Sequence, residues 1–150
     1  MFFVSCKESN QMESEIEITI DKDLMDKINL CFQLGFASVD ESGMFQPYAL
    51  FESQNGIATQ LYASGNIDTT LILARDDIKT RCLSSYAIGY VGALEEDNIQ
   101  TKAIFVEAGS KNSPNKAYIF AHKFKPTDKA GAVLKIGDMV FMEICDSIFK

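Results

Sequence analysis

The sequence predicts an α+β fold, with two helices and a mainly antiparallel sheet of about five to six strands. Two observations support this class. In the second half of the chain, strand-like segments follow one another directly and are joined by short polar turns, so they fold back antiparallel. In the first half, two segments with helical spacing flank a hairpin signal, and this grouping of strands with strands is typical of α+β domains. The expected order is a possible first strand, a helix, two strands, a second helix and four strands.

The first element is a short strand or extended segment at Glu15–Ile20, where apolar and polar residues alternate. Asp21 follows it as a candidate N-cap. A helix is predicted from about Lys22 to Leu34, ending near Gly35, because apolar residues recur there at helical spacing. These apolar residues are Leu24, Met25, Ile28, Cys31 and Phe32.

A β-hairpin is predicted next. Asn55 and Gly56 lie between two apolar segments, and this dipeptide is the strongest short hairpin signal because both of its residues tolerate a positive φ. We therefore expect Tyr48–Ser53 to pair with Ile57–Ala63.

The second half of the chain is predicted to contain one helix and then only strands. The helix extends from about Thr69 to Cys82, with Asp68 as its N-cap. Three strands follow between Ser85 and Phe124 and form a meander. One or two strands in Val133–Cys145 close the chain, and Gly137-Asp138 provides a bend or a tight turn between them.

Both faces of the meander are apolar. In its middle strand Ile104 and Val106 share one face and Phe105 lies on the other, and the last strand shows no clean alternation either. A sheet that is apolar on both sides needs cover on both sides. The two helices can cover one face, so we expect the second to be covered by the tail strand, by loops or by another copy of the chain. This argument favours a homodimer.

The chain contains one histidine, His122, and histidine titrates near neutral pH. A catalytic histidine needs a carboxylate to orient it, and Glu107 on the neighbouring strand is a candidate for that role. These two residues are the weak candidates for a catalytic or ligand-binding site. A lone histidine on an aromatic strand is more often structural, and no nucleophile or phosphate-binding motif accompanies the pair.

The last strand of the meander is a candidate interaction surface, because lysines interleave there with aromatic residues. Such a pattern on a sheet can stack on single-stranded bases. No RNP-like motif is present and the chain is acidic, so a protein partner is favoured over nucleic acid. The residues of this surface are Tyr118, Phe120, Lys123, Phe124 and Lys125.

A chain of 150 residues is expected to form a single α+β domain, here over residues 15–150, after a poorly ordered segment at residues 1–14. Met12 in that segment is an alternative start. No apolar segment is long enough to span a membrane and the N-terminus lacks the features of a secretory signal, so we expect a cytoplasmic protein. Four scattered cysteines and one histidine favour neither a metal site nor a cofactor.

The net charge of −7 is spread unevenly. Residues 1–99 hold 6 Lys or Arg and 16 Asp or Glu, a balance of −10, whereas residues 100–150 hold 8 Lys and 5 acids, a balance of +3. An acidic chain is repelled by phosphate backbones, which argues against nucleic acid. We expect a non-enzymatic interaction module, acting as a homodimer or with a protein partner, for example as an immunity protein neutralises a basic toxin. The alternative is a small enzyme or small-molecule binder with a site near His122 and Glu107.

The order helix, hairpin, helix and meander resembles that of small interaction domains of the roadblock and longin types. In those domains a five-stranded antiparallel sheet carries helices and often dimerises. The resemblance is one of element order, and it assigns a role to no residue.

Overall fold

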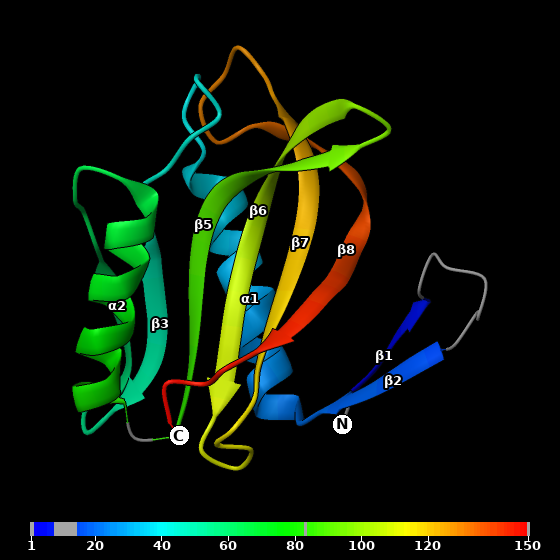
Figure 1. Cartoon of the computed structure of the whole chain (residues 1–150). Coiled ribbons are helices and arrows are strands. Elements are labelled where there is room, and N and C mark those ends of the chain that lie inside the picture. Colours follow the sequence, from blue (N-terminus) through cyan, green and yellow to red (C-terminus); the bar gives the residue numbers. More distant parts are fainter. Residues whose placement is uncertain (1, 8–14, 83, 150) are drawn as a thin grey trace.

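A computed structural model describes residues 2–7, 15–82 and 84–149, and Figure 1 shows how its elements are arranged. Within these ranges the predicted order of helices and strands is present, with one additional strand at the front. The elements are β1 (Phe2–Lys7), β2 (Glu15–Ile20), α1 (Lys22–Ser38), β3 (Tyr48–Ser53), β4 (Gly56–Leu61), α2 (Ile67–Arg81), β5 (Ser85–Glu96), β6 (Ile99–Ser110), β7 (Ala117–Pro126) and β8 (Val133–Cys145).

Six strands form one antiparallel sheet in the order β4-β3-β5-β6-β7-β8. With the two helices, this sheet makes an α+β fold and confirms the predicted class. Neighbouring strands are consecutive in sequence except β3 and β5, which β4 and α2 separate in the chain. The pairing of β3 with β5, from Tyr48↔Gly89 to Phe51↔Tyr86, therefore joins the hairpin of the first half to the meander of the second.

The two helices lie on opposite faces of the sheet, whereas we expected them on the same face (Figure 1). α1 covers the centre of one face, where Ile28 packs in a core with Ile104. α2 covers the β3 and β5 end of the other face, where Ile78 packs in a second core with Phe51. Both faces of β3 and β5 carry apolar residues, so each face gains from burial under its own helix.

Helix α1 begins as predicted and ends later than predicted. The Oδ1 atom of Asp21 accepts a hydrogen bond from the Leu24 amide at 2.8 Å, which makes Asp21 the N-cap. The helix continues through Gly35 to Ser38, because this glycine provides close approach to the sheet and not a helix end. A Cβ atom at position 35 would lie 3.0 Å from the Cδ1 atom of Ile104.

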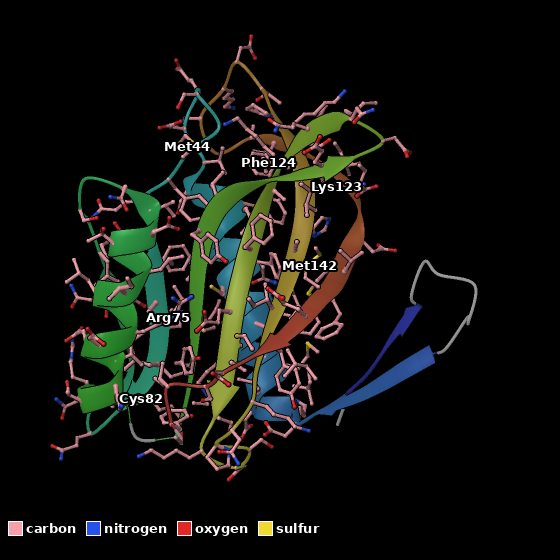
Figure 2. The ribbon with its side chains drawn as sticks, viewed as in Figure 1. Met44, Arg75, Cys82, Lys123, Phe124 and Met142 are labelled. Carbon is pink, nitrogen blue, oxygen red and sulfur yellow. The ribbon has the colours of Figure 1, made fainter. Side chains whose placement is uncertain are left out.

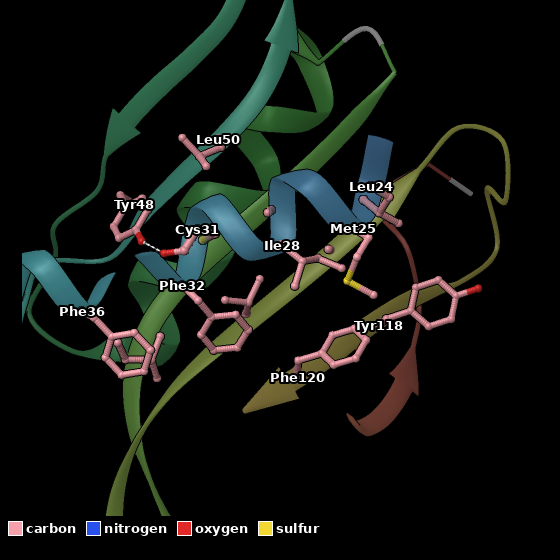
Figure 3. Packing of buried hydrophobic residues seen from close by; sticks show 14 of the residues in the cluster. Leu24, Met25, Ile28, Cys31, Phe32, Phe36, Tyr48, Leu50, Tyr118 and Phe120 are labelled. Carbon is pink, nitrogen blue, oxygen red and sulfur yellow. Dashed lines mark hydrogen bonds between the residues drawn. The ribbon is translucent and has the colours of Figure 1, made fainter. Parts of the chain in front are cut away.

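Core packing holds α1 firmly against the sheet (Figure 3). Met25, Ile28 and Phe32 lie on the buried side of the helix, and Phe120 of β7 belongs to the same core. The hydroxyl of Tyr48 donates a hydrogen bond to the backbone carbonyl of Cys31, as the dashed line in Figure 3 marks. This bond links β3 to the middle of the helix inside the core.

The β3–β4 and β5–β6 turns differ in their backbone conformation. At the β3–β4 turn only Gly56 has a positive φ, of 102°, so Asn55 does not use the conformation that we expected of it. At the β5–β6 turn Asp97 and Asn98 both have positive φ, of 51° and 64°, between the paired residues Glu96 and Ile99. Two central residues of this kind define the type I′ turn that suits the twist of a hairpin.

Helix α2 begins two residues earlier than predicted. The Oδ1 atom of Asn66 accepts a hydrogen bond from the Thr69 amide at 2.8 Å, so Asn66 is the N-cap and Asp68 lies within the first turn. Strand β8 is continuous, and the bend expected at Gly137 is present as an irregularity in its register with β7.

At the N-terminus, β1 pairs antiparallel with β2 in a separate two-stranded sheet, which projects from the main sheet beside β8 (Figure 1). The sequence suggested no element before Glu15, and the expectation of poor order in residues 1–14 stays a prediction. Met12 lies outside the described residues. Neither of the described helices combines the length and the apolar character needed to cross a membrane.

Candidate functional site

The two residues proposed for a catalytic site lie on opposite faces of the sheet. His122 of β7 pairs with Ile104 of β6 and shares the face that α1 covers. Glu107 of β6 pairs with Ile119 and shares the other face. A side chain on one face cannot orient a side chain on the other through the sheet, so this arrangement does not support the expected pair.

The imidazole of His122 is held by α1 and β8. Its ring centroid lies 6.1 Å from that of Phe32 and 5.1 Å from that of Phe36, both in edge-on geometry. Its Nε2 atom lies 2.9 Å from the carbonyl oxygen of Gly137. The ring borders a cavity of about 310 Å³ whose lining includes the Lys135 ammonium and no carboxylate. These contacts are those of a packed residue at the rim of the α1 core.

The Glu107 carboxylate takes part in a buried charge cluster with α2 (Figure 2 labels Arg75 between α2 and β5). Glu107 is 1% exposed, and its Oε1 atom accepts hydrogen bonds from Nε of Arg75 at 3.0 Å and from NH2 at 2.5 Å. The hydroxyl of Tyr86 donates to its Oε2 atom at 2.9 Å. The carboxylate is thus fully engaged inside the protein, in an arrangement suited to fixing α2 on the sheet.

The environment of this cluster raises the pKa values of its neighbours. The hydrogen bonds to Glu107 raise the pKa of the Arg75 guanidinium. Burial raises the pKa of Tyr86 above its usual range, and the negative charge of Glu107 adds a smaller effect in the same direction. Burial raises the pKa of Tyr90 to about 12. Arg75, Tyr86 and Tyr90 therefore do not exchange a proton near neutral pH.

The candidate surface on the last meander strand is divided between the two faces. Tyr118, Phe120 and Phe124 are buried in the α1 core, with exposures of 7%, 0% and 1%, so they cannot form an outer surface of this fold. Lys123 and Lys125 lie on the opposite face. The alternation of side chains along a strand separates the aromatic residues from the lysines, although they are adjacent in sequence.

The face that carries the two lysines is open over β6, β7 and β8. In Figure 1 no helix lies in front of these three strands, since α2 covers only the β3 end of this face. A row of apolar residues crosses the open part, comprising Tyr90, Phe105, Ala121 and Val140, which are paired across neighbouring strands. The ring centroids of Tyr90 and Phe105 are 5.5 Å apart and the rings are stacked. Both rings are half-buried, Ala121 is buried and Val140 is 45% exposed.

The C-terminal tail covers one end of this face. Ile148 is 9% exposed in the α2 core, and the ring of Phe149 lies 5.7 Å from that of Tyr86. The tail thus provides part of the cover that the sequence required, and α2 provides another part. Neither the tail nor α2 covers the centre and the far end of β6–β8.

Two charges of opposite sign flank the apolar row of the open face. Glu143 of β8 pairs with Ile119 on one side of it, and Lys123 lies on the other side, two residues beyond Ala121 along β7. The Lys123 ammonium also forms an ion pair with Glu96 at 3.3 Å. The sequence did not reveal this arrangement, because it depends on the register between β7 and β8.

Metal-binding geometry is not found in the described ranges, where no three His, Cys, Asp or Glu residues are grouped around a common point. Cys31, Cys82 and Cys145 are free thiols. Burial raises the pKa of Cys31 to about 12 and that of Cys145 to about 11, which makes both poor nucleophiles at neutral pH.

Comparisons with known proteins add no assignment: no family model, no curated protein and no solved structure matches the chain. The resemblance to roadblock and longin domains therefore stays one of element order. Any proposal about function depends on the geometry of this chain alone.

Proposed function

We propose that this protein is a non-enzymatic interaction module that forms a homodimer through the open face of β6–β8. The supporting observation is the apolar row of Tyr90, Phe105, Ala121 and Val140 on the face that α1 does not cover, in which Val140 is 45% exposed, Tyr90 and Phe105 are half-buried and Ala121 is buried. Apolar sheet faces are buried in folded proteins, and two such faces pack against each other at about 10 Å in β-sandwiches.

The charges beside the row favour a second copy as the partner. A two-fold axis in the plane between the sheets and across the strands would place Glu143 of each protomer near Lys123 of the other. The same surface is then complementary to itself, as a two-fold interface requires. The pair would also steer the encounter between two acidic chains, because opposite charges meet on both sides of the row.

A small enzyme or ligand binder with a site near His122 and Glu107 is the alternative expected from the sequence. The two side chains lie on opposite faces of the sheet, and each is engaged by neighbouring residues. No observation on the described residues favours this alternative over an interaction module.

Light scattering coupled to size-exclusion chromatography tests the proposal. We expect twice the formula mass of 16.7 kDa for the wild-type chain, and a monomer for Val140→Asp, which places a charge in the apolar row. Ile72→Asp is the matched control, because Ile72 is 56% exposed on α2, away from the row. A wild-type monomer at every concentration would refute the homodimer, and equal loss of the dimer in both variants would refute the assigned face.

A further inference from the structure

The other edge of the sheet, strand β4, lacks the features that normally protect a strand edge. β4 carries no charged residue and no proline, and it pairs with β3 over six residues without a register shift. Edge strands of natural proteins are usually blocked by charges, prolines or bulges. The opposite edge, β8, has Lys135, Asp138, Glu143 and two register shifts, and β1 lies beside it. Of the two edges of the six-stranded sheet, β4 is therefore the one that is ready to accept a further strand.

The peptide groups of β4 that point away from β3 can be assigned from the register. The Tyr62 amide donates to the Pro47 carbonyl at 2.9 Å, so this pair is of the hydrogen-bonded type. Antiparallel pairs alternate between bonded and non-bonded types, so Ile57, Thr59 and Leu61 direct their N–H and C=O groups outward. The Leu61 carbonyl accepts the side-chain amide of Gln60 at 3.1 Å, which an incoming strand would replace.

The same three residues also present their side chains on the α1 side of the sheet. Ile57 and Leu61 are 59% and 57% exposed there. On the flank of α1, Leu30 and Leu34 are separated by one helical turn and are 38% and 37% exposed. Leu30 and Ile57 line a common cavity of about 230 Å³. An extended segment beside β4 would thus meet unpaired peptide groups and apolar side chains together.

The charge at one end of this site indicates the kind of partner. The cavity beside Ile57 is lined by Asp23, Asp26 and Glu52 and by one cation, Lys27, which bonds Glu52 at 2.9 Å. This lining has a balance of two negative charges, and because Lys22 beside it pairs with Asp26 at 2.9 Å, one negative charge remains unbalanced. A second copy of β4 would bring no charged residue to it, because the strand GIATQL has none. A segment with a lysine or arginine at that end fits better.

We propose that β4 and the flank of α1 bind an extended segment of another protein by strand addition. The segment adds antiparallel or parallel to β4 and carries apolar side chains at alternate positions. It has a lysine or arginine at the end beside Ile57. This mode draws affinity from main-chain hydrogen bonds and specificity from alternate side chains. The surface is distinct from the open face of β6–β8, so each proposal stands or fails separately.

The test begins with a peptide-display selection on the wild-type chain, followed by anisotropy titration of the enriched peptides. Thr59→Pro removes an outward N–H without breaking the pairing to β3, and prolines are tolerated at such edge positions. Thr59→Ala keeps the N–H and is the matched control. We expect an alternating apolar consensus with a terminal basic residue, binding about tenfold weaker to Thr59→Pro, and unchanged binding to Thr59→Ala.

Ile57→Lys provides a second variant that does not depend on how well proline is tolerated, since a charge on an edge strand opposes strand addition. It is also expected to weaken binding about tenfold. Selection that enriches no peptide, or peptides that bind both variants as tightly as the wild type, would overturn the proposal. Conversion of a wild-type dimer to a monomer by Thr59→Pro would overturn it too, because the occupant would then be a second copy. Val140→Asp should leave peptide binding unchanged.

Discussion

Removal of the Glu107 carboxylate is expected to destabilise the protein strongly, although the residue lies on a sheet that is partly open. Glu107 is 1% exposed and accepts hydrogen bonds from Arg75 and Tyr86. Glu107→Ala leaves both donors without their partner and leaves a cavity where the side chain was. The loss combines two costs that differ in size because the donors differ in their access to water.

The magnitude follows from the exposure of each donor. Tyr86 is 0% exposed, and a buried hydroxyl left without a partner costs about 1–3 kcal/mol. The side chain of Arg75 is 36% exposed, so water can solvate it and its cost falls below the 3–5 kcal/mol typical of a fully buried pair. We expect a total of about 3 kcal/mol. For a chain of this length, that corresponds to a fall in Tm of roughly 6–12 °C.

Urea unfolding followed by circular dichroism measures this loss. Glu95→Ala is the matched control, because Glu95 is an exposed acid near the end of β5, and its removal should cost less than about 0.5 kcal/mol. The double variant Arg75→Leu with Glu107→Leu should lose less than the sum of its single changes, with a coupling of about 2 kcal/mol. A cost below about 0.5 kcal/mol for Glu107→Ala, or additive single changes, would show that the cluster does not hold α2 on the sheet.

Two further predictions concern a buried thiol and a helix cap. Burial raises the pKa of Cys31 to about 12 from an unfolded value near 8.5, so its contribution to stability is complete below pH 8.5 and decreases as the pH rises toward 12. Urea midpoints measured at rising alkaline pH should fall less steeply for Cys31→Ala than for the wild type, and parallel slopes would contradict this. Asn66→Ala should cost about 1 kcal/mol and Asp68→Ala only a few tenths in thermal unfolding, whereas the reverse order would make Asp68 the cap.

Local patterns predicted most of the elements because they depend on residues close in sequence. The stripe from Leu24 to Phe32 predicted α1, and Asp21 was identified as its N-cap. The ends of elements were less accurate, because Gly35 has a role in packing against β6 that no local pattern shows. The start of α2 differed for a similar reason, since Asn66 and Asp68 are both good caps and the chain geometry before the helix selects between them.

The candidate site was predicted poorly because it depends on contacts between distant residues. The partner of Glu107 is Arg75, 32 residues away on α2, and no local pattern links the two residues. The separation of His122 from Glu107 follows from the β6–β7 register, in which a shift of one residue would exchange the two faces. A residue pattern can indicate a strand, but it does not give its register.

The sequence by itself determined the elements, their order and the antiparallel meander, because helical spacing, alternation and turn residues act over a few positions. It also showed that both faces of the meander are apolar and need cover. The tertiary structure decided what covers them: α1 on one face, and α2 with the C-terminal tail on part of the other. That choice depends on the pairing of β3 with β5 and on how two helices divide two apolar faces, and these long-range packing energies leave no local trace in the chain.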